Sequence, residues 1–547
     1  MVYCGKASQG CQSCRGRRIK CDKKNPECSQ CIRVGKKCPG YRDQLSLMFR
    51  DESSKVIQKA QAQWGSPGSS TEGDRESSSQ SPGPVGVVPA SRQPHYPHTR
   101  SVSPGHSVAT QEIVSSKIPR RVEPNLDQRG LKFYVERYLL NHPDSPRTPE
   151  LMDVYFGGEE AIRNVMVAVG LAGMSNLLGN KSMSLVARSK YVTALKQTGQ
   201  LIASASRDRG PVVKPLRSIV TLALFEVVQG KGSKVSAGSA NTHIHGAVAL
   251  SRSVLPVTNS PNGGARGVLQ LMFSMFIPSQ MTDSPLPPGF FECLKLCKTL
   301  LQGCNEDCAV DLAFAISRLL HLLFTADRAN SLDDQLETDD MIQQFLEMET
   351  IFDRIEQQLR VAYPFVEHQS GRVSPALFRG KWHRYSEIWG ARIWNHFRWG
   401  RLLLGEYIIR FTTDYPRSTD RLISPPHKIQ CYATIERMAE ETLVSTPSHW
   451  HHPALDEATA RIYEAPGQGG AGAAGLPSLL WHIKKSGCAP NVPPDFWDWS
   501  YNILQVVWKN MGMQHAQALA EVMEEHQKTL LTNVVGASPI SVNRGML

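Results

Sequence analysis

Residues 11–38 read CQSCRGRRIKCDKKNPECSQCIRVGKKC and contain six of the thirteen cysteines of the chain. The spacing C-x2-C-x6-C occurs twice in this stretch, and a link of six residues joins the two copies. A chain shorter than about 40 residues usually needs disulfides, metals or a partner to fold, and these 28 residues include almost no apolar side chains. A bound metal is therefore expected to take the place of a hydrophobic core.

The number of cysteines predicts how many metal ions this segment binds. Structural zinc takes four ligands in a tetrahedron, whereas each half of the repeat supplies three thiolates. Six sulfurs can complete two tetrahedra only if two of them bridge both ions, and the near-symmetry of the repeat favours Cys11 and Cys28 as the bridges. The predicted site holds two Zn²⁺, with the ligands Cys11, Cys14, Cys21, Cys28, Cys31 and Cys38. Zinc ligation contributes on the order of 10 kcal/mol, so the segment is expected to unfold without metal.

Positive charge is concentrated in the same part of the chain. The formal charge of all 547 residues is +11, and residues 1–42 hold eleven Lys and Arg against two acids, which gives +9. A local excess of this kind indicates a polyanionic partner. The first residues lack the apolar stretch of an export signal, and the apolar stretch 309–324 is short and interrupted by charges. We therefore expect an intracellular protein without a membrane span, whose clustered thiols bind metal.

These residues resemble the fungal Zn2Cys6 binuclear cluster DNA-binding domain. The resemblance covers the six cysteines, the basic run 15–20 (RGRRIK) and Pro26 in the link. It implies a helix starting near Gln12 that reads a CGG-like triplet in the major groove of double-stranded DNA. The base-contacting position of the family falls on Arg18, with Arg17 beside it, and arginine can bind guanine O6 and N7 bidentately. The expected phosphate contacts are Arg15, Lys20, Lys23 and Lys24.

Other interpretations of paired C-x-x-C motifs are a redox dithiol, an iron–sulfur site and a metal-storage segment. None of them requires the x6 repeat or the basic run, so the DNA-binding cluster is favoured. Lys36 and Lys37 stay open between phosphate contact and solvating charge. The basic cluster is also compatible with nuclear import, and the nucleus is the expected location.

Composition divides the rest of the chain into segments. Residues 43–60 favour a short helical extension that packs back on the cysteine-rich segment, the predicted Zn2Cys6 finger. They contain barely two heptads, so the sequence does not support a coiled-coil homodimer. Residues 53–119 include 15 Ser, 8 Pro and 6 Gly but no Leu, Met or Phe, which predicts a disordered linker. Residues 126–532 show helical periodicity, as in Ala187, Tyr191 and Ala194, and predict one large all-α domain. A flexible tail is expected at residues 533–547.

The predicted helical domain resembles, less specifically, the regulatory region of fungal transcription factors. The resemblance lies in the order of short motifs such as LALFE at 222–226, HIHGA at 243–247 and WNHFR at 394–398. It implies a helical scaffold that restrains or releases activation. The fold class expected for the whole chain is therefore mostly α, with a small Zn2Cys6 finger, a linker and a large all-α domain.

Several features of the helical region have competing interpretations. The tryptophans between Trp382 and Trp399 alternate with arginines such as Arg398 and Arg401, which favours a packed helix with an exposed arginine edge over a single-strand-binding surface. The acidic segment 333–356 favours a solvated amphipathic helix over an activation segment. The four cysteines between Cys293 and Cys308 favour core thiols over a second metal site.

The sequence as a whole favours a sequence-specific regulator of RNA polymerase II genes that binds double-stranded DNA and, by expectation, co-regulators or the transcription machinery. The alternative is an enzyme or ligand-binding helical domain that the finger tethers to DNA. We find no G-x-S-x-G, P-loop or H-E-x-x-H motif, so a non-enzyme is expected.

Overall fold

The computed structural model describes two parts of the chain, a cysteine-rich segment and a helical body. The described residues are 11–17, 19–22, 27–39, 124–139, 158–208, 212–230, 232–254, 263–328, 335–371, 373–466 and 475–535. The predicted extension 43–60, the predicted linker 53–119 and residues 536–547 of the predicted tail lie outside them. The last helix continues to Val535, so residues 533–535 belong to the body rather than to a tail.

The cysteine-rich segment contains two one-turn helices, one in each half of the repeat. α1 spans Gln12–Gly16 and α2 spans Ser29–Ile32. The buried cluster of this segment consists of cysteines, while Ile19, Ile32 and Val34 are exposed. Its described residues therefore have no hydrophobic core other than the sulfur atoms, as the sequence predicted.

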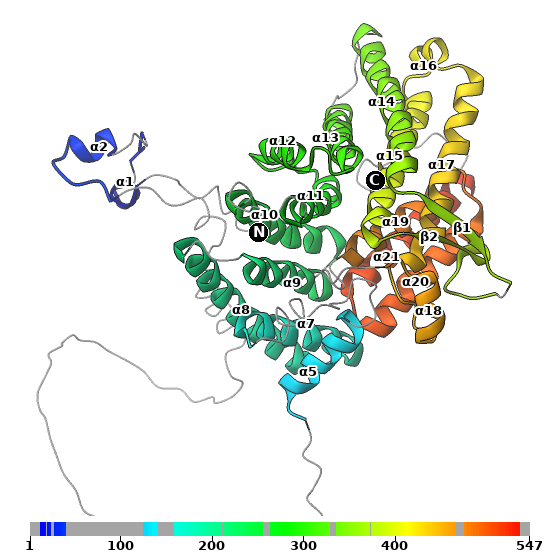
Figure 1. Cartoon of the computed structure of the whole chain (residues 1–547). Helices are drawn as coiled ribbons and strands as arrows, with labels where there is room; N and C mark the ends of the chain where they lie inside the picture. Colours follow the sequence, from blue (N-terminus) through cyan, green and yellow to red (C-terminus); the bar gives the residue numbers. More distant parts are fainter. Residues whose placement is uncertain are drawn as a thin grey trace, which may run out of the picture. The chain divides into compact units, whose positions relative to one another are not determined.

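The body is built almost entirely of helices, which confirms the predicted fold class (Figure 1). Its first half contains α5 (Leu126–Tyr134), the π-helix η1 (Val135–Leu139), α7 (Glu160–Leu178), α8 (Lys181–Asp208), α9 (Val213–Gln229), α10 (Ser233–Val254), α11 (Gly263–Met281), α12 (Phe290–Leu301) and α13 (Asp307–Arg328). Its second half contains α14 (Gln335–Ala362), β1 (Phe365–Gln369), η3 (Phe378–Gly380), β2 (Lys381–Tyr385), α15 (Ile388–Asp414), α16 (Pro416–Leu422), α17 (Pro425–Ser445), η4 (Thr446–Ser448), α18 (Glu457–Tyr463), α19 (Leu476–Gly487), α20 (Pro494–Met511) and α21 (Gln514–Val535).

Helix α7 is the central helix of the first half. It is buried along most of its length and packs against α5, α8, α9 and α20. Two glycines allow α5 and α7 to touch through their backbones, because a Cβ atom on Gly170 would lie 1.8 Å from the carbonyl oxygen of Gly130. Figure 1 shows α7, α8, α9 and α10 side by side below α11 and α12. The apolar periodicity of Ala187 and Ala194 on α8 corresponds to its buried side.

Helix α15 is the central helix of the second half. It packs against α13, α14, α17 and α19, and its Trp394, Phe397 and Trp399 are almost completely buried. The predicted exposed arginine edge is wrong, because Arg398 and Arg401 are 0% and 7% exposed. These arginines face acidic side chains of neighbouring helices, which a single-helix pattern does not reveal.

A two-stranded antiparallel hairpin interrupts the helices before α15. β1 pairs with β2 in a register that places Phe365 opposite Tyr385 and His368 opposite Trp382. The rings of His368 and Trp382 are stacked, with their centroids 5.0 Å apart. Trp382 therefore lies on a strand and not on the helix to which its spacing had assigned it.

Two helices, α7 and α13, are long and apolar enough to cross a membrane by length and composition. In each of them, 67% of the most apolar window is buried inside the body. Their apolar side chains are thus covered by neighbouring helices, as in the core helices of a globular domain.

Candidate metal centre and nucleic-acid interface

The six cysteines of the N-terminal segment lie near one another. Cys11, Cys14, Cys21 and Cys28 form one group of four potential ligands, and Cys11, Cys28, Cys31 and Cys38 form a second. Within each group, all four sulfur atoms lie within 4.8 Å of one another. Cys11 and Cys28 belong to both groups, as expected for two ions that share two ligands.

The distances between the sulfur atoms fit zinc ligation. The Sγ atom of Cys11 lies 3.7 Å from those of Cys28 and Cys31, and the Sγ atoms of Cys14 and Cys28 are also 3.7 Å apart. Four sulfurs at about 2.3 Å from a tetrahedral zinc are about 3.8 Å apart, because the edge of a tetrahedron is about 1.63 times the bond length. This segment is thus a zinc cluster domain whose six cysteines are arranged for two zinc ions.

The protonation of these thiols is linked to metal binding. Burial raises the pKa of the Cys14 thiol to about 12, and it raises the pKa values of Cys28 and Cys31 as well. Without a cation, these buried groups stay protonated. A coordinated metal ion favours the thiolate, so metal binding and deprotonation are linked.

Backbone groups hold the thiols in position. The amide of Cys14 donates to the Sγ of Cys11 at 3.4 Å, and the amide of Ser29 donates to the Asp22 carboxylate at 3.2 Å. After α2, Gly35 has a φ of +63°, and the amide of Lys36 reaches back to the carbonyl of Cys31. Glycine suits this left-handed position, because a Cβ atom is disfavoured there. The chain thereby turns toward the last ligand, Cys38.

The structure describes only part of the predicted DNA-contacting set. Arg17 and Lys20 are exposed, as a contact with DNA requires. Arg18, Lys23 and Lys24 and the side chain of Arg15 lie outside the described residues. In the second half of the repeat, Arg33, Lys36 and Lys37 are exposed as well. Lys36 and Lys37 stay open between phosphate contact and solvating charge. Arg33 is a further exposed basic residue, and its position two residues after Cys31 is the sequence signal for it.

The cysteines of α12 and α13 are core thiols, as predicted. Cys293 and Cys297 have no exposed surface, and Cys308 is 6% exposed. Cys297 lies against the carbonyl of Ala265 at 3.8 Å. Cys304 is only half-buried and follows α12.

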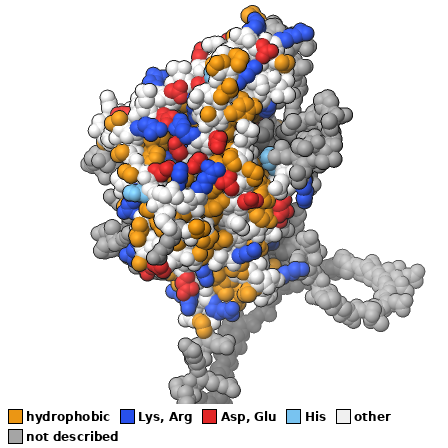
Figure 2. All heavy atoms as spheres, turned by 90° about the vertical axis from the view of Figure 1, so that its right-hand side faces the viewer, with side chains coloured by type: hydrophobic (Ala, Val, Ile, Leu, Met, Phe, Trp, Pro, Cys, Tyr) orange, Lys and Arg blue, Asp and Glu red, His pale blue; other side chains and the backbone are white. Residues whose placement is uncertain are grey.

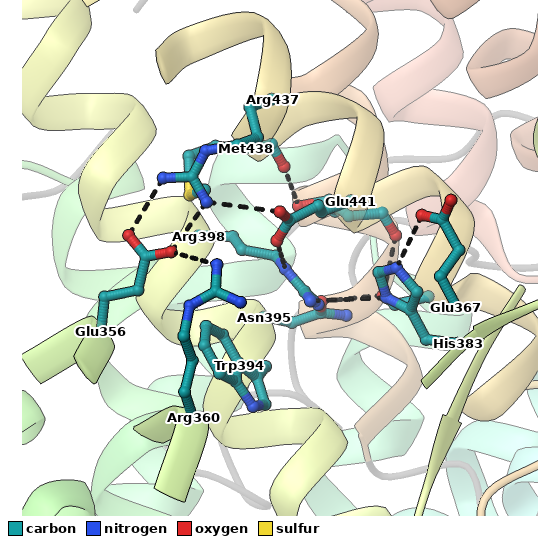
Figure 3. Close-up of polar contacts among 12 residues, drawn as sticks. Glu356, Arg360, Glu367, His383, Trp394, Asn395, Arg398, Arg437, Met438 and Glu441 are labelled. Carbon is teal, nitrogen blue, oxygen red and sulfur yellow. Dashed lines mark hydrogen bonds and ion pairs between the residues drawn. The ribbon is translucent and has the colours of Figure 1, made fainter. Parts of the chain in front are cut away.

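A network of charged side chains, some buried and some partly exposed, crosses the second half of the body (Figure 3). Arg437 on α17 forms a bidentate pair with Glu356 on α14, at 2.7 and 3.0 Å, and its Nη1 also contacts Glu441 at 3.3 Å. Burial alone would raise the pKa of Glu356, but hydrogen bonds from Arg437 and Arg360 outweigh it and hold this pKa below its ordinary value. The acidic helix α14 thus contributes ion pairs to the interior and is not simply a solvated amphipathic helix.

A polar pocket of about 240 Å³ lies between the two halves of the helical body. Its lining includes Arg266, Asn305, Glu306, Tyr363 and Glu387. Glu306 accepts hydrogen bonds from Tyr363 and Trp389, and Arg266 pairs with both carboxylates. These groups satisfy one another, so the pocket by itself carries no functional assignment.

The outer face of the second half carries positive and negative side chains mixed together, so no large patch of it has a single sign of charge. Figure 2 shows Lys and Arg side chains interspersed with Asp and Glu over this face, with apolar side chains between them. Residues 43–547 together have a formal charge of only +2. The charge that suits a polyanion is thus concentrated in the N-terminal segment.

Comparisons with known proteins give one family and two relatives. The fungal Zn(2)-Cys(6) binuclear cluster domain matches residues 9–47. The aspercryptin biosynthesis cluster-specific transcription regulator atnN of Emericella nidulans is 49% identical over 37 residues, which are 7% of this chain and 6% of that protein. White-opaque regulator 2 of Candida albicans is 53% identical over 38 residues, which are 7% of this chain and 8% of that protein. The chain therefore covers less than a tenth of either relative. No solved structure matches it.

Proposed function

We propose that this chain is a zinc-dependent, sequence-specific DNA-binding regulator of transcription that acts in the nucleus at RNA polymerase II promoters. The observation that carries the proposal is the pair of overlapping four-thiol groups in a segment with a formal charge of +9. The two relatives are both named as regulators, one of them explicitly of transcription. Each is similar to this chain over 37 or 38 residues, which is close to the length of the zinc cluster domain.

In this proposal, Cys11 and Cys28 bridge the two zinc ions, and the other four cysteines each bind one. Two Zn²⁺ offset four of the six thiolate charges, so the cluster itself contributes two negative charges. The surrounding Lys and Arg side chains outnumber these and keep the segment positive. Zinc supplies no chemistry here beyond holding the fold, since all of its ligand positions are occupied by cysteines.

The DNA contacts divide into two kinds. Arg18 and Arg17 read bases of a CGG-like triplet from the major groove, where a bidentate arginine–guanine contact discriminates by about 1–3 kcal/mol. Arg15, Lys20, Lys23 and Lys24 bind phosphates and fix the register. Arg17 and Lys20 are both exposed, so both side chains are accessible to DNA. The helical body then acts as the regulatory part that couples DNA binding to co-regulators.

The test is binding of the full chain to two labelled duplexes, one with a CGG triplet and one with the triplet scrambled. Arg18→Ala should lower the preference for CGG by about 5- to 150-fold, which corresponds to 1–3 kcal/mol. The matched variant Lys23→Ala should weaken binding to both duplexes alike, because a phosphate contact carries no sequence information. Equal losses on both duplexes with Arg18→Ala would contradict the base-reading role. Selection of bound sites from a random duplex pool would show whether one triplet or two at fixed spacing are bound.

A further inference from the structure

A second group of metal-ligand side chains lies in the helical body, far along the chain from the zinc cluster domain. Glu349 on α14 faces His427 and Cys431, which are four residues apart on α17 and share one side of that helix. One donor atom of each residue lies within 4.8 Å of the other two. No local sequence pattern connects these residues, because 78 positions separate Glu349 from His427.

The distances within this trio suit a small divalent ion. The Nε2 atom of His427 lies 2.6 Å from Oε2 of Glu349, and the Sγ of Cys431 lies 3.9 Å from Oε1 of the same carboxylate. Donor atoms around a tetrahedral zinc are about 3.3–3.8 Å apart. The sulfur–carboxylate distance is thus close to that of two zinc ligands, and the imidazole and the carboxylate would have to separate by about 0.7 Å to bind one ion.

The chemistry of the donors restricts the kind of ion. A thiol together with an imidazole and a carboxylate favours zinc and similar borderline metals over Mg²⁺ or Ca²⁺, which prefer oxygen ligands. Three protein ligands leave one position of a tetrahedron for water or a small ligand.

The position of the trio combines burial with access. Cys431 is 2% exposed, whereas the side chain of His427 is 34% exposed and gives the site an edge open to solvent. The amide of His427 is held by the Oγ of Ser424, the N-cap of α17. Helix α17, which carries His427 and Cys431, therefore begins at a fixed point, while the partly exposed imidazole of His427 can rotate toward an ion.

The surrounding charges also favour a cation. Arg401 on α15 lies 3.3 Å from Oε1 of Glu349, and its other terminal nitrogen lies 3.0 Å from Asp353. With Cys431 protonated, the two carboxylates exceed the single arginine by one negative charge. Binding of a divalent ion with release of the thiol proton to solvent would bring the group to neutrality.

We propose that Glu349, His427 and Cys431 bind one divalent metal ion of the zinc class, independently of the zinc cluster domain. The ion would join α14 to α17 and so link two helices that also meet through the pair between Glu356 and Arg437. Its open fourth position makes it a site at which a small ligand could act on the body. The inference does not depend on the proposed function, because none of its residues belongs to the DNA-binding segment.

The test counts metal in the purified full chain after dialysis against micromolar Zn²⁺ followed by a metal-free wash. His427→Gln and Cys431→Val should each hold one zinc ion fewer per chain than the unmodified protein. Two matched controls, Cys308→Val at a buried thiol and His451→Gln at a half-buried histidine, should hold the same number as the unmodified protein. Zinc should also raise the Tm of the unmodified chain but not that of His427→Gln, since only a ligand bound to the folded state stabilises it.

The outcome is decided by the difference between the variants and the unmodified chain, whatever number of ions the zinc cluster domain holds. If His427→Gln and the unmodified chain hold equal zinc, the trio is a hydrogen-bonded group only and the proposal is wrong. If Cys431→Val does not fold, His427→Gln alone decides, because its side chain is partly exposed. A second readout is Co²⁺ added to the metal-stripped chain. The cysteines of the zinc cluster domain contribute thiolate-to-cobalt absorption in every variant, and additional absorption that Cys431→Val lacks and Cys308→Val retains supports the site.

Discussion

The Arg398 guanidinium donates from Nε to Oε2 of Glu441 at 3.1 Å, although the Arg398 side chain has no exposed surface. Its Nη1 also donates to the hydroxyl of Tyr385 at 2.9 Å and to the side-chain oxygen of Asn395 at 3.0 Å. One arginine therefore connects α15, α17 and the hairpin strand β2 (Figure 3). A buried charge of this kind is tolerated only where partners surround it.

Loss of the Arg398 charge should destabilise the body strongly. Arg398→Met keeps much of the side-chain volume but leaves Glu441 without one of its two arginines. It also removes one of the two hydrogen-bond partners of the Tyr385 hydroxyl and of the Asn395 side-chain oxygen, which keep His383 and Ser445. Breaking a buried pair in this way costs about 3–5 kcal/mol of the free energy of unfolding. Urea denaturation of the full chain would measure this loss.

The control for this prediction is Arg461→Ala, which removes an exposed arginine paired with Glu457 within α18. Both side chains are more than half exposed, so the change should be within about 0.5 kcal/mol. A loss below about 1 kcal/mol with Arg398→Met would show that Arg398 is not an essential part of the interior.

The grouping of the cysteines in the zinc cluster domain could be predicted from the sequence, whereas the interior of the body could not. Six cysteines at fixed spacing restrict the chain locally, so the spacing alone predicted two overlapping ligand groups sharing Cys11 and Cys28. Apolar periodicity likewise predicted helices, because it reports which side of a segment avoids water.

The failures concern contacts between segments far apart in sequence. Arg398 and Arg401 were expected to be exposed because arginine usually is, and their acidic partners lie on other helices, 43 and 48–52 positions away. The hairpin 365–385 was missed because strand-like alternation over five residues is a weak signal. The trio of Glu349, His427 and Cys431 exists only once α14 and α17 are packed.

Gly512 should be far less tolerant of alanine than another glycine with the same backbone conformation. Gly512 ends α20 with a φ of +62°, and a Cβ atom there would lie 2.1 Å from the carbonyl oxygen of Gly173 on α7. Gly179 ends α7 with the same φ, but a Cβ atom there would meet nothing within 4 Å. Gly179→Ala should therefore cost only the left-handed strain of about 1–2 kcal/mol.

Gly512→Ala adds the separation of two backbones to this strain, so its Tm should fall several degrees further than that of Gly179→Ala. Thermal unfolding followed by circular dichroism would measure the difference. Similar Tm values for the two variants would mean that α7 and α20 are not in the close contact described.

Stability should fall as the pH drops from about 6.5 toward 5 because of buried histidines. Burial lowers the pKa of His515 from its ordinary value of 6.5 to about 4, and the side chain is 3% exposed. In this window the unfolded chain takes up a proton that the folded chain does not, so stability is present above pH 6.5 and is lost as the pH falls. The slope is about 1.4 kcal/mol per pH unit for one such group, which gives about 2 kcal/mol between pH 6.5 and 5.

The test compares His515→Leu with the unmodified chain by denaturation at both pH values. The variant should lose about 2 kcal/mol less than the unmodified chain on acidification, whatever its stability at pH 7. A parallel decline in both proteins would exclude His515 as a source of the acid sensitivity.

Removal of a shared zinc ligand should have a larger effect than removal of an unshared one. Cys28 belongs to both groups of four thiols, whereas Cys38 belongs to one. Cys28→Ala should therefore lower the zinc content of the full chain by two ions and Cys38→Ala by one.

DNA binding should be lost with Cys28→Ala, because the zinc cluster domain has no core other than its cysteines in the described residues. The Tm of the helical body should stay unchanged in both variants, since its core contains none of these cysteines. Equal zinc losses from the two variants would contradict the bridging role of Cys28, and a lower Tm of the body would show that the zinc cluster domain and the body fold as one unit.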